Sequence, residues 1–190
     1  MPVAWAKSMR VNEIFEVRSF GLKLEHFVLQ LSNFSLAAGE RVAFLGHNGA
    51  GKTSFLEGVL GLRETVRMTG TAFGKPLIPE LGLIGFSHRV GFQLPNLALP
   101  PGLSVCDIIN LQKRCLPRTN SACADVLDLN EFIGSRVSTL SSGQRQRLDL
   151  FLALGHCPDI AILDEPTNGL DDKRAKAFLD WMEDACSSAI

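Results

Sequence analysis

The stretch Gly46-His47-Asn48-Gly49-Ala50-Gly51-Lys52-Thr53 decides the fold of this 190-residue chain, because it fits the pattern G-x-x-x-x-G-K-[ST]. The apolar segment Arg41–Leu45 before it predicts a short strand, and Lys52–Gly61 predicts a helix. Glycines let such a loop turn successive backbone N–H groups inward, where they and the positive helix end bind phosphate oxygens. A glycine-rich turn that fits the pattern by chance is the alternative. The order strand, loop and helix favours a phosphate-binding loop.

Strand and helix patterns alternate on both sides of this loop. Residues 14–24 and 27–36 are rich in Phe, Val and Leu and predict strands, as do part of 83–94 and the apolar run 160–163. Helical spacing of apolar residues covers 105–133, 142–154 and 171–185. This alternation favours an α/β fold with a mainly parallel sheet and a helical subdomain at about residues 103–155.

Composition limits the classes of function. A net charge of −1, with 46% hydrophobic and 21% charged residues, is typical of a soluble globular protein. The chain has no basic excess that would indicate nucleic acid as a partner, and no apolar run long enough to cross a bilayer. The first ten residues do not resemble a secretory signal, and the five cysteines include no CxxC pair, which favours the cytosol. Membrane attachment is therefore expected only through another subunit.

A second chemical site is predicted where the apolar run Ile160–Leu163 ends in Asp164 and Glu165. The carboxyl ends of parallel strands are where α/β proteins bind ligands. Asp164 is expected to hold Mg²⁺ through water, and Glu165 to polarise an attacking water molecule. Lys52 would bridge the β- and γ-phosphates, and the Thr53 hydroxyl would be a further magnesium ligand. An isolated Asp-Glu pair would indicate only a solvated strand end, but the phosphate loop favours the functional interpretation.

A capped helix start is predicted at Leu140-Ser141-Ser142-Gly143-Gln144, which Arg145-Gln146-Arg147 follows. Ser141 is a favoured N-cap residue, and the N–H groups after it form an anion site. Taken alone, this segment indicates an ordinary helix start.

Together these segments resemble the ATP-binding cassette (ABC) ATPase family, the nucleotide-binding domains of ABC transporters. Residues 46–53 resemble its Walker A motif, Leu140–Gln144 its LSGGQ signature, Ile160–Glu165 its Walker B motif and Asn168–Asp171 its D-loop. Order and spacing match over roughly residues 14–185. The resemblance implies a single ABC-type domain over residues 1–190, with a P-loop NTPase core, an N-terminal antiparallel β part and a helical signature subdomain.

The resemblance also implies an activity, which is ATP hydrolysis with Mg²⁺ in a head-to-tail dimer with itself or a homologous cassette. Each ATP would lie between the Walker A motif of one chain and the signature of the other. Lys52 and Glu165 are the expected catalytic residues, and Thr53 and Asp164 the expected metal ligands. A transmembrane permease subunit is the expected partner and would hold the chain on the cytoplasmic face of the membrane. The residues expected to contact the nucleotide are Gly46, His47, Asn48, Gly49, Ala50, Gly51, Lys52, Thr53, Ser54, Gln93, Ser141, Ser142, Gly143 and Gln144.

Two departures from the family pattern affect the expected nucleotide contacts. Ser142 replaces the first glycine of the signature; serine is small, but a side chain at the dimer interface can weaken closure. Pro95 occupies the position of the family's Q-loop glutamine, and Gln93 lies two residues earlier. Either the loop shifts to present Gln93, or the contact to metal and water is absent, and both alternatives stay open.

Two further departures affect adenine binding and turnover. The chain has no tyrosine to mark the adenine-stacking position, for which Phe20 and then Phe27 are the candidates. A phenylalanine in an apolar strand is more often part of the core. The sequence stops at Ile190, before the family's switch histidine is expected, which predicts intact nucleotide binding with weak hydrolysis.

The leading hypothesis is therefore the ATP-binding and ATP-hydrolysing subunit of an ABC transporter. A non-transport cassette in translation or DNA maintenance is an alternative, but such proteins usually carry two cassettes or long coiled-coil insertions. A binding-only regulatory cassette is another, and it predicts tight ATP binding without turnover. The motifs encode neither cargo nor direction of transport, nor whether the dimer is homomeric.

Overall fold

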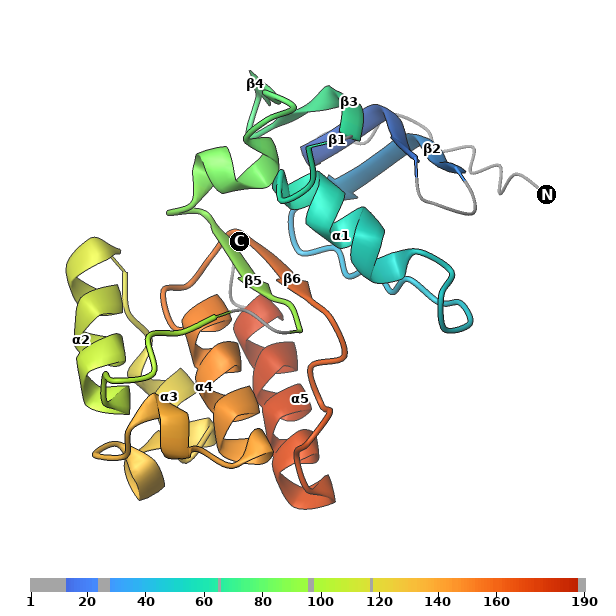
Figure 1. Cartoon of the computed structure of the whole chain (residues 1–190). Coiled ribbons are helices and arrows are strands. Elements are labelled where there is room, and N and C mark those ends of the chain that lie inside the picture. Colours follow the sequence, from blue (N-terminus) through green and yellow to red (C-terminus); the bar gives the residue numbers. More distant parts are fainter. Residues whose placement is uncertain (1–12, 24–27, 65, 96–97, 117, 188–190) are drawn as a thin grey trace. The chain divides into compact units, whose positions relative to one another are not determined.

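The computed structural model describes residues 13–23, 28–64, 66–95, 98–116 and 118–187, which form two compact units that meet in sequence at Phe86 and Ser87 (Figure 1). The predicted phosphate loop belongs to the first, and the acidic strand end and the predicted signature belong to the second.

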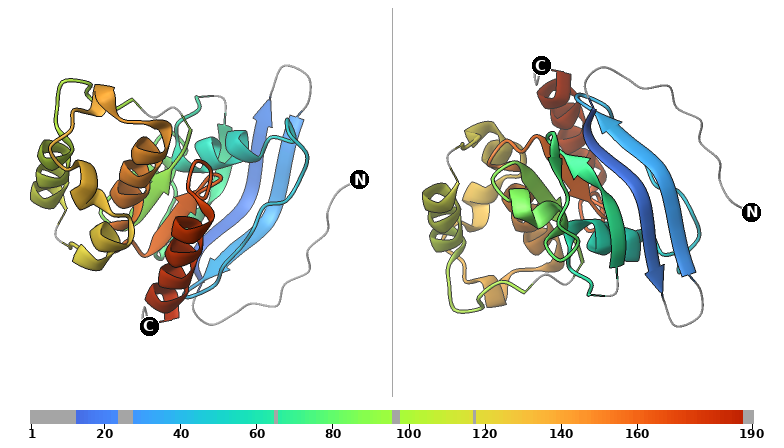
Figure 2. Two further views of the ribbon diagram at one scale, coloured as in Figure 1. Left: turned by 90° about the horizontal axis from the view of Figure 1, so that it is seen from below. Right: turned by 90° about the horizontal axis from the view of Figure 1, so that it is seen from above.

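The first unit is built on an antiparallel sheet in the order β2-β1-β3-β4. Its strands are β1 (Glu13–Lys23), β2 (Val28–Ala37), β3 (Val66–Ala72) and β4 (Lys75–Pro76), and β1 and β2 run side by side in both views of Figure 2. The helix α1 (Lys52–Leu60) and the 3₁₀ helix η1 (Gly82–Phe86) complete the unit. The predicted strands at 14–24 and 27–36 are thus confirmed, as is the predicted antiparallel N-terminal part.

Large apolar side chains of β1 and α1 fill the core of this unit. On β1, Phe15 and Val17 are buried, and after a register shift the buried positions become Phe20 and Leu22. Such a bulge moves the apolar face by one residue and keeps it toward the core. Phe20 is 3% exposed, and its ring contacts that of Phe55 with the centroids 4.9 Å apart.

The strand predicted at Arg41–Leu45 is wrong. Residues 40–47 form no strand, and Leu45 is 92% exposed. An apolar run favours burial, but a strand also needs a neighbouring strand to pair its N–H and C=O groups. No described strand pairs with this segment. Within it, Phe44 still contacts the Phe34 and Phe55 rings, with centroids 5.6 and 5.0 Å apart.

The second unit places helices against a two-stranded parallel sheet of β5 (Val90–Gln93) and β6 (Ile160–Leu163), in which Gln93 pairs with Leu163. The predicted helix at 142–154 and the strand at 160–163 are confirmed at the predicted residues. The predicted helical stretch 105–133 is divided into three elements. The helical elements are α2 (Val105–Cys115), α3 (Ser121–Val126), η2 (Leu129–Phe132), η3 (Val137–Thr139), α4 (Ser142–Leu154) and α5 (Asp172–Ser187).

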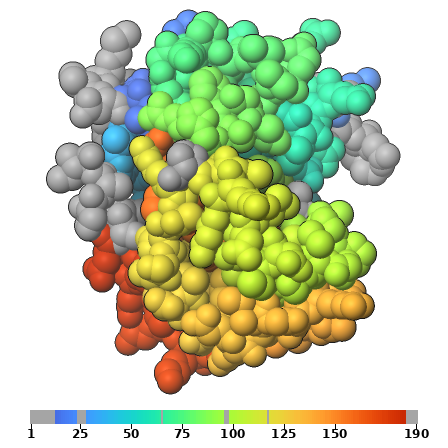
Figure 3. All heavy atoms as spheres, turned by 90° about the vertical axis from the view of Figure 1, so that its left-hand side faces the viewer, coloured from blue at the N-terminus to red at the C-terminus, as the bar shows by residue number. Residues whose placement is uncertain are grey.

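One apolar cluster joins these helices. Leu148 and Phe151 of α4 and Phe178 of α5 are buried in it together with residues of α2 and η2. The space-filling view shows the yellow-green to orange atoms of residues between α2 and α4 packed closely over one face (Figure 3). Leu140 and Leu170, which precede α4 and α5, pack against this cluster, so the segments leading into both helices share one support.

Candidate functional site

The predicted phosphate loop has the backbone that an anion site needs. Gly49 and Gly51 have φ values of 82° and 88°, a left-handed conformation that costs glycine little. The Ala50 N–H donates to the His47 carbonyl oxygen at 3.1 Å, which closes a turn. Gly51 is the N-cap of α1 and has no side chain to satisfy the first amides of the helix. Those amides and the positive end of the helix favour a bound anion.

The Lys52 side chain folds back over this loop. Its Nζ donates hydrogen bonds to the carbonyl oxygens of Gly46 at 2.6 Å and His47 at 3.1 Å. The His47 ring is turned to the backbone, where its Nδ1 lies 2.8 Å from the Asn48 carbonyl oxygen. The ammonium group and the amides of α1 thus lie on one short loop. This donor set fits the phosphates of a nucleotide.

The acidic strand end lies beside Gln93. The Asp164 N–H donates to the Gln93 carbonyl oxygen at 3.0 Å. Both residues are buried, with Asp164 8% and Gln93 4% exposed. Gln93 Nε2 lies 3.5 Å from Gln146 Oε1, and its own Oε1 has no hydrogen-bond partner within the described part of the chain. A buried amide oxygen without a partner is costly and indicates a site that a ligand or water would complete.

Glu165 is exposed and holds an unusual backbone conformation. Its φ is 52°, and such strain in a non-glycine residue gathers at functional sites. The Asn168 side-chain amide donates to the Glu165 carboxylate, and the Asn168 N–H donates to the Glu165 carbonyl oxygen at 3.1 Å. Gln146 Nε2 also donates to the Pro166 carbonyl oxygen at 3.0 Å. The loop after β6 therefore has a defined shape that presents the carboxylate to solvent.

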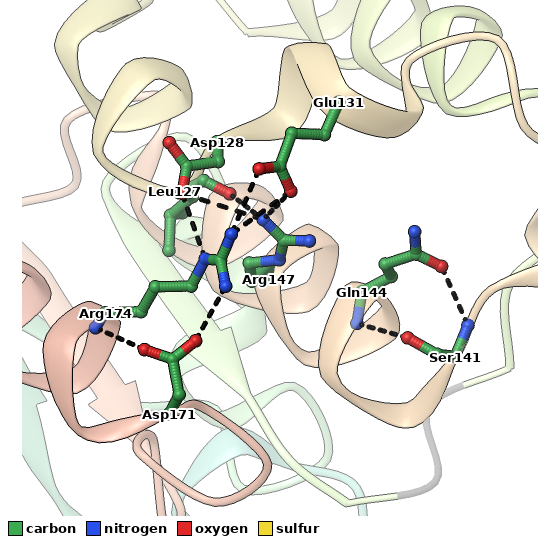
Figure 4. A network of polar contacts seen from close by, with 8 residues as sticks. All are labelled: Leu127, Asp128, Glu131, Ser141, Gln144, Arg147, Asp171 and Arg174. Carbon is green, nitrogen blue, oxygen red and sulfur yellow. Dashed lines mark hydrogen bonds and ion pairs between the residues drawn. The ribbon is translucent and has the colours of Figure 1, made fainter.

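The predicted signature forms a capping box at the start of α4. The Gln144 N–H donates to Ser141 Oγ at 3.2 Å, and the Ser141 N–H donates to Gln144 Oε1 at 2.9 Å (Figure 4). The predicted N-cap role of Ser141 is confirmed. Both polar side chains are used within the box, so the donors of the predicted anion site would be the backbone N–H groups of Ser142 and Gly143, and this site stays a prediction.

A close backbone contact joins this helix start to the loop after β6. A Cβ atom built on Gly143 would lie 2.7 Å from the Gly169 carbonyl oxygen, closer than real Cβ atoms approach. Gly169 itself has a φ of 77°. Only glycine at position 143 allows this approach, and the sequence pattern alone did not reveal it.

Sequence reasoning also missed a cluster of charges next to this contact. Arg147 of α4 and Arg174 of α5 both contact carboxylates of the turn around η2 (Figure 4). The spacing of Arg147 four residues after Gly143, on the same helix face, was the signal that could have singled it out. The partner residues of the cluster are Leu127, Asp128, Glu131, Phe132 and Asp171.

Of the two candidates for adenine stacking, the structure tests only Phe20. Phe20 is buried against Phe55 in the core, so the structure contradicts an exposed stacking role for its ring. Phe27 lies outside the described residues.

Thr53 belongs to the first unit and Asp164 to the second, so their joint role as magnesium ligands stays a prediction. Within the described ranges, no helix combines the length and apolarity that a membrane crossing needs.

Residues 29–168 match the family described as ABC transporter. The chain is 34% identical to the cytochrome c biogenesis ATP-binding export protein CcmA of Rhodopseudomonas palustris (strain BisB5), over 80% of this chain and 74% of that protein. It is 32% identical to the sn-glycerol-3-phosphate import ATP-binding protein UgpC of Jannaschia sp. (strain CCS1), over 76% of this chain and 43% of that protein. The chain spans less than half the length of several curated relatives that it matches.

The fold has solved counterparts. A structure described as the ATP binding subunit of an ABC transporter superposes with a TM-score of 0.76 and 22% identity, over 92% of this chain and 75% of that chain. At this identity the likeness supports the fold alone. It confirms the predicted α/β P-loop architecture with an antiparallel N-terminal sheet and a parallel sheet.

Proposed function

The chain belongs to the ABC transporter family, and from this membership we propose that it binds MgATP and hydrolyses it to energise transport through a separate membrane subunit. The single observation that carries the proposal is the phosphate loop. Its left-handed glycines, its uncapped α1 start and the Lys52 ammonium form a donor set for phosphates. The relatives' printed roles in import and in export support a transporter subunit. In this proposal the membrane subunit holds the chain on the cytoplasmic face of the membrane.

Each predicted residue has a role in this proposal. Backbone amides of the stretch from Gly46 to Ser54, with Lys52, hold the phosphates, and Glu165 polarises the attacking water. Thr53 and Asp164 hold Mg²⁺, which when bound offsets the negative charge that builds up on the phosphates. In a head-to-tail dimer, the signature residues Ser141, Ser142, Gly143 and Gln144 contact the nucleotide of the partner subunit.

We also propose that Gln93 takes the role of the Q-loop glutamine. It ends β5, the strand paired with β6, which Asp164 follows, and its buried Oε1 has no partner among the described residues. Pro95, the residue at the aligned position, is exposed and has no donor or acceptor in its side chain. Gln93→Ala is expected to lower turnover more than it weakens MgATP binding. Unchanged turnover would leave the second alternative, in which the contact is absent.

Calorimetry with MgATP tests the proposed function. Wild-type protein is expected to bind MgATP, and Lys52→Ala is expected to weaken binding by at least about tenfold, because the loop loses its cation. Lys75→Ala is the matched control, since it removes an exposed lysine from the hairpin of β3 and β4 in the same unit. Magnesium-independent binding, or equal binding by wild type and Lys52→Ala, would refute the proposal.

A second experiment separates hydrolysis from binding. Glu165→Gln is expected to bind MgATP as tightly as wild type and to lose at least about a hundredfold in kcat, because the amide cannot accept a proton. Wild-type protein that binds MgATP tightly without turnover would instead be a binding-only regulatory cassette. Turnover stimulated by nucleic acid would favour the non-transport alternative.

A further inference from the structure

Two segments that are distant in sequence meet at the start of α4. The signature segment, residues 140–144, contacts the loop at residues 167–171 through the backbones of Gly143 and Gly169. Glycine backbones pack closely but offer no side chain to lock the contact. Gln146 of α4 donates to the Pro166 carbonyl oxygen at 3.0 Å, which holds only the residue before the loop. Residues 167–171 therefore need a further contact if they are to keep a fixed relation to the helix start.

The charge cluster one turn along α4 supplies that lock from the helix side. Arg147 is nearly buried, with its side chain 8% exposed. Its Nη1 donates to Glu131 Oε2 at 2.9 Å and to the Leu127 carbonyl oxygen at 3.3 Å. The guanidinium also lies 4.6 Å from the centroid of the Phe132 ring. These contacts fix α4 to the turn around η2.

Arg174 supplies the lock from the loop side. Its Nε donates to Asp128 Oδ2 at 3.0 Å and its Nη2 to Glu131 Oε1 at 3.0 Å, so it shares the carboxylates that Arg147 contacts. Its Nη1 and its backbone N–H donate to Asp171 at 2.6 and 2.9 Å. These hydrogen bonds lower the pKa of Asp171 and keep the last residue of the loop anionic.

The planar fork of an arginine is suited to this task. Arg174 reaches three carboxylates at once, and all of them with Arg147 are drawn together in Figure 4. Two cations face three anions in the cluster, so removing Arg174 leaves one cation among three carboxylates. Mutual repulsion would then push Asp171 away from the turn around η2.

We propose that Arg174 is a positioning residue that clamps the loop at residues 167–171 to the signature segment, so that the two form one rigid surface. The inference rests on the proposed ATPase function for its kinetic consequence only. A signature held at the wrong place would still leave the phosphate loop of the same chain intact. Loss of the clamp therefore lowers turnover and spares MgATP affinity.

Hydrogen exchange of the full chain, read by mass spectrometry, tests the clamp without relying on activity. Arg174→Ala is expected to raise exchange several-fold in peptides covering both 167–171 and 141–146, with little change at β5 or α1. Arg174→Lys should restore only part of the protection, because a point charge cannot reach three carboxylates. Lys173→Ala is the matched control, since it removes an exposed cation from the same helical turn and keeps the backbone N–H through which Lys173 contacts Asp171.

A double-mutant cycle keeps the test decisive if Arg174→Ala loses stability overall. Asp128→Asn removes one partner of the clamp, and its effect on exchange should be non-additive with that of Arg174→Ala. Additive effects, or faster exchange at 167–171 alone with 141–146 unchanged, would overturn the proposal.

Kinetics of the same variants provide the second readout. In Arg174→Ala we expect kcat to fall several-fold while KM for MgATP and its dissociation constant stay within about twofold of wild type. A loss of MgATP affinity equal to the loss of turnover would overturn the positioning role. If wild-type protein had no ATPase activity, the proposed function would fail, but the exchange results would still decide whether the clamp exists.

Discussion

Replacing Gly143 by alanine tests the backbone contact on which the arrangement of the signature depends. The added Cβ would lie 2.7 Å from the Gly169 carbonyl oxygen, whereas ordinary van der Waals contact begins at 3.4 Å. The atom it meets belongs to the backbone, so it cannot swing aside as a flexible side chain would. The loop and the helix start must therefore separate by several tenths of an ångström.

Two opposing effects set the sign of the stability change. In an open helical position, replacing glycine by alanine raises the free energy of unfolding by roughly 0.5–1 kcal/mol, because the unfolded chain loses freedom. Overpacking against a rigid neighbour costs about 1–3 kcal/mol. The difference spans about 0–2.5 kcal/mol, and from the middle of both ranges we expect a net loss of about 1 kcal/mol. For a chain of this length that corresponds to a fall in melting temperature of about 2–4 °C.

Thermal unfolding followed by circular dichroism measures this change directly. Gly134→Ala is the matched control, since a Cβ there would meet nothing within 4 Å and the residue belongs to the same unit. We expect the control to melt at or slightly above the wild-type temperature. A melting temperature for Gly143→Ala equal to or higher than wild type would refute the contact, because only the stabilising effect would then operate.

Three further predictions concern buried groups of the second unit. Burial lowers the pKa of His156, so the folded state resists protonation of this ring. The free energy of unfolding is therefore full above about pH 6.5 and falls as the pH drops below that value. The urea concentration at the unfolding midpoint should differ between pH 8 and pH 5.5 in wild type, and this difference should shrink in His156→Asn. Burial raises the pKa of the Cys123 thiol to about 12, and the charge of the neighbouring Cys157 is the second cause. Alkylation at pH 8 should therefore label the exposed Cys106 and Cys115 rapidly, and Cys123 only after denaturation. Rapid labelling of all three thiols would contradict the burial of Cys123. Arg147→Met keeps an apolar stem but loses hydrogen bonds of a nearly buried cation, and should cost about 1–3 kcal/mol in urea unfolding; no change would show that the charge cluster adds nothing to stability.

Local signals in the sequence predicted the elements that carry the candidate site. The spacing of glycines before Lys52 predicted a loop and a helix start, and the structure has both at those residues. Ser141 predicted the N-cap of α4, and only the structure shows that Gln144 completes a capping box with it. The strand 160–163 was found at the predicted residues because a short apolar run bounded by polar residues marks a buried strand. Each signal acts over a few residues, which is why the sequence alone carries it.

Packing between distant residues decided the rest. In the sequence, a phenylalanine buried in the core looks the same as one exposed for stacking on adenine. Only the contact of the Phe20 ring with the Phe55 ring shows that Phe20 belongs to the core. The contacts of Arg174 join residues 43 and 46 positions apart, and no pattern along the chain predicts such partners. The order of residues within a segment determines which of its backbone N–H and C=O groups find hydrogen-bond partners inside that segment. The free energy of packing two distant segments depends on the fit of their shapes and charges at the contact, which exists only in the folded chain.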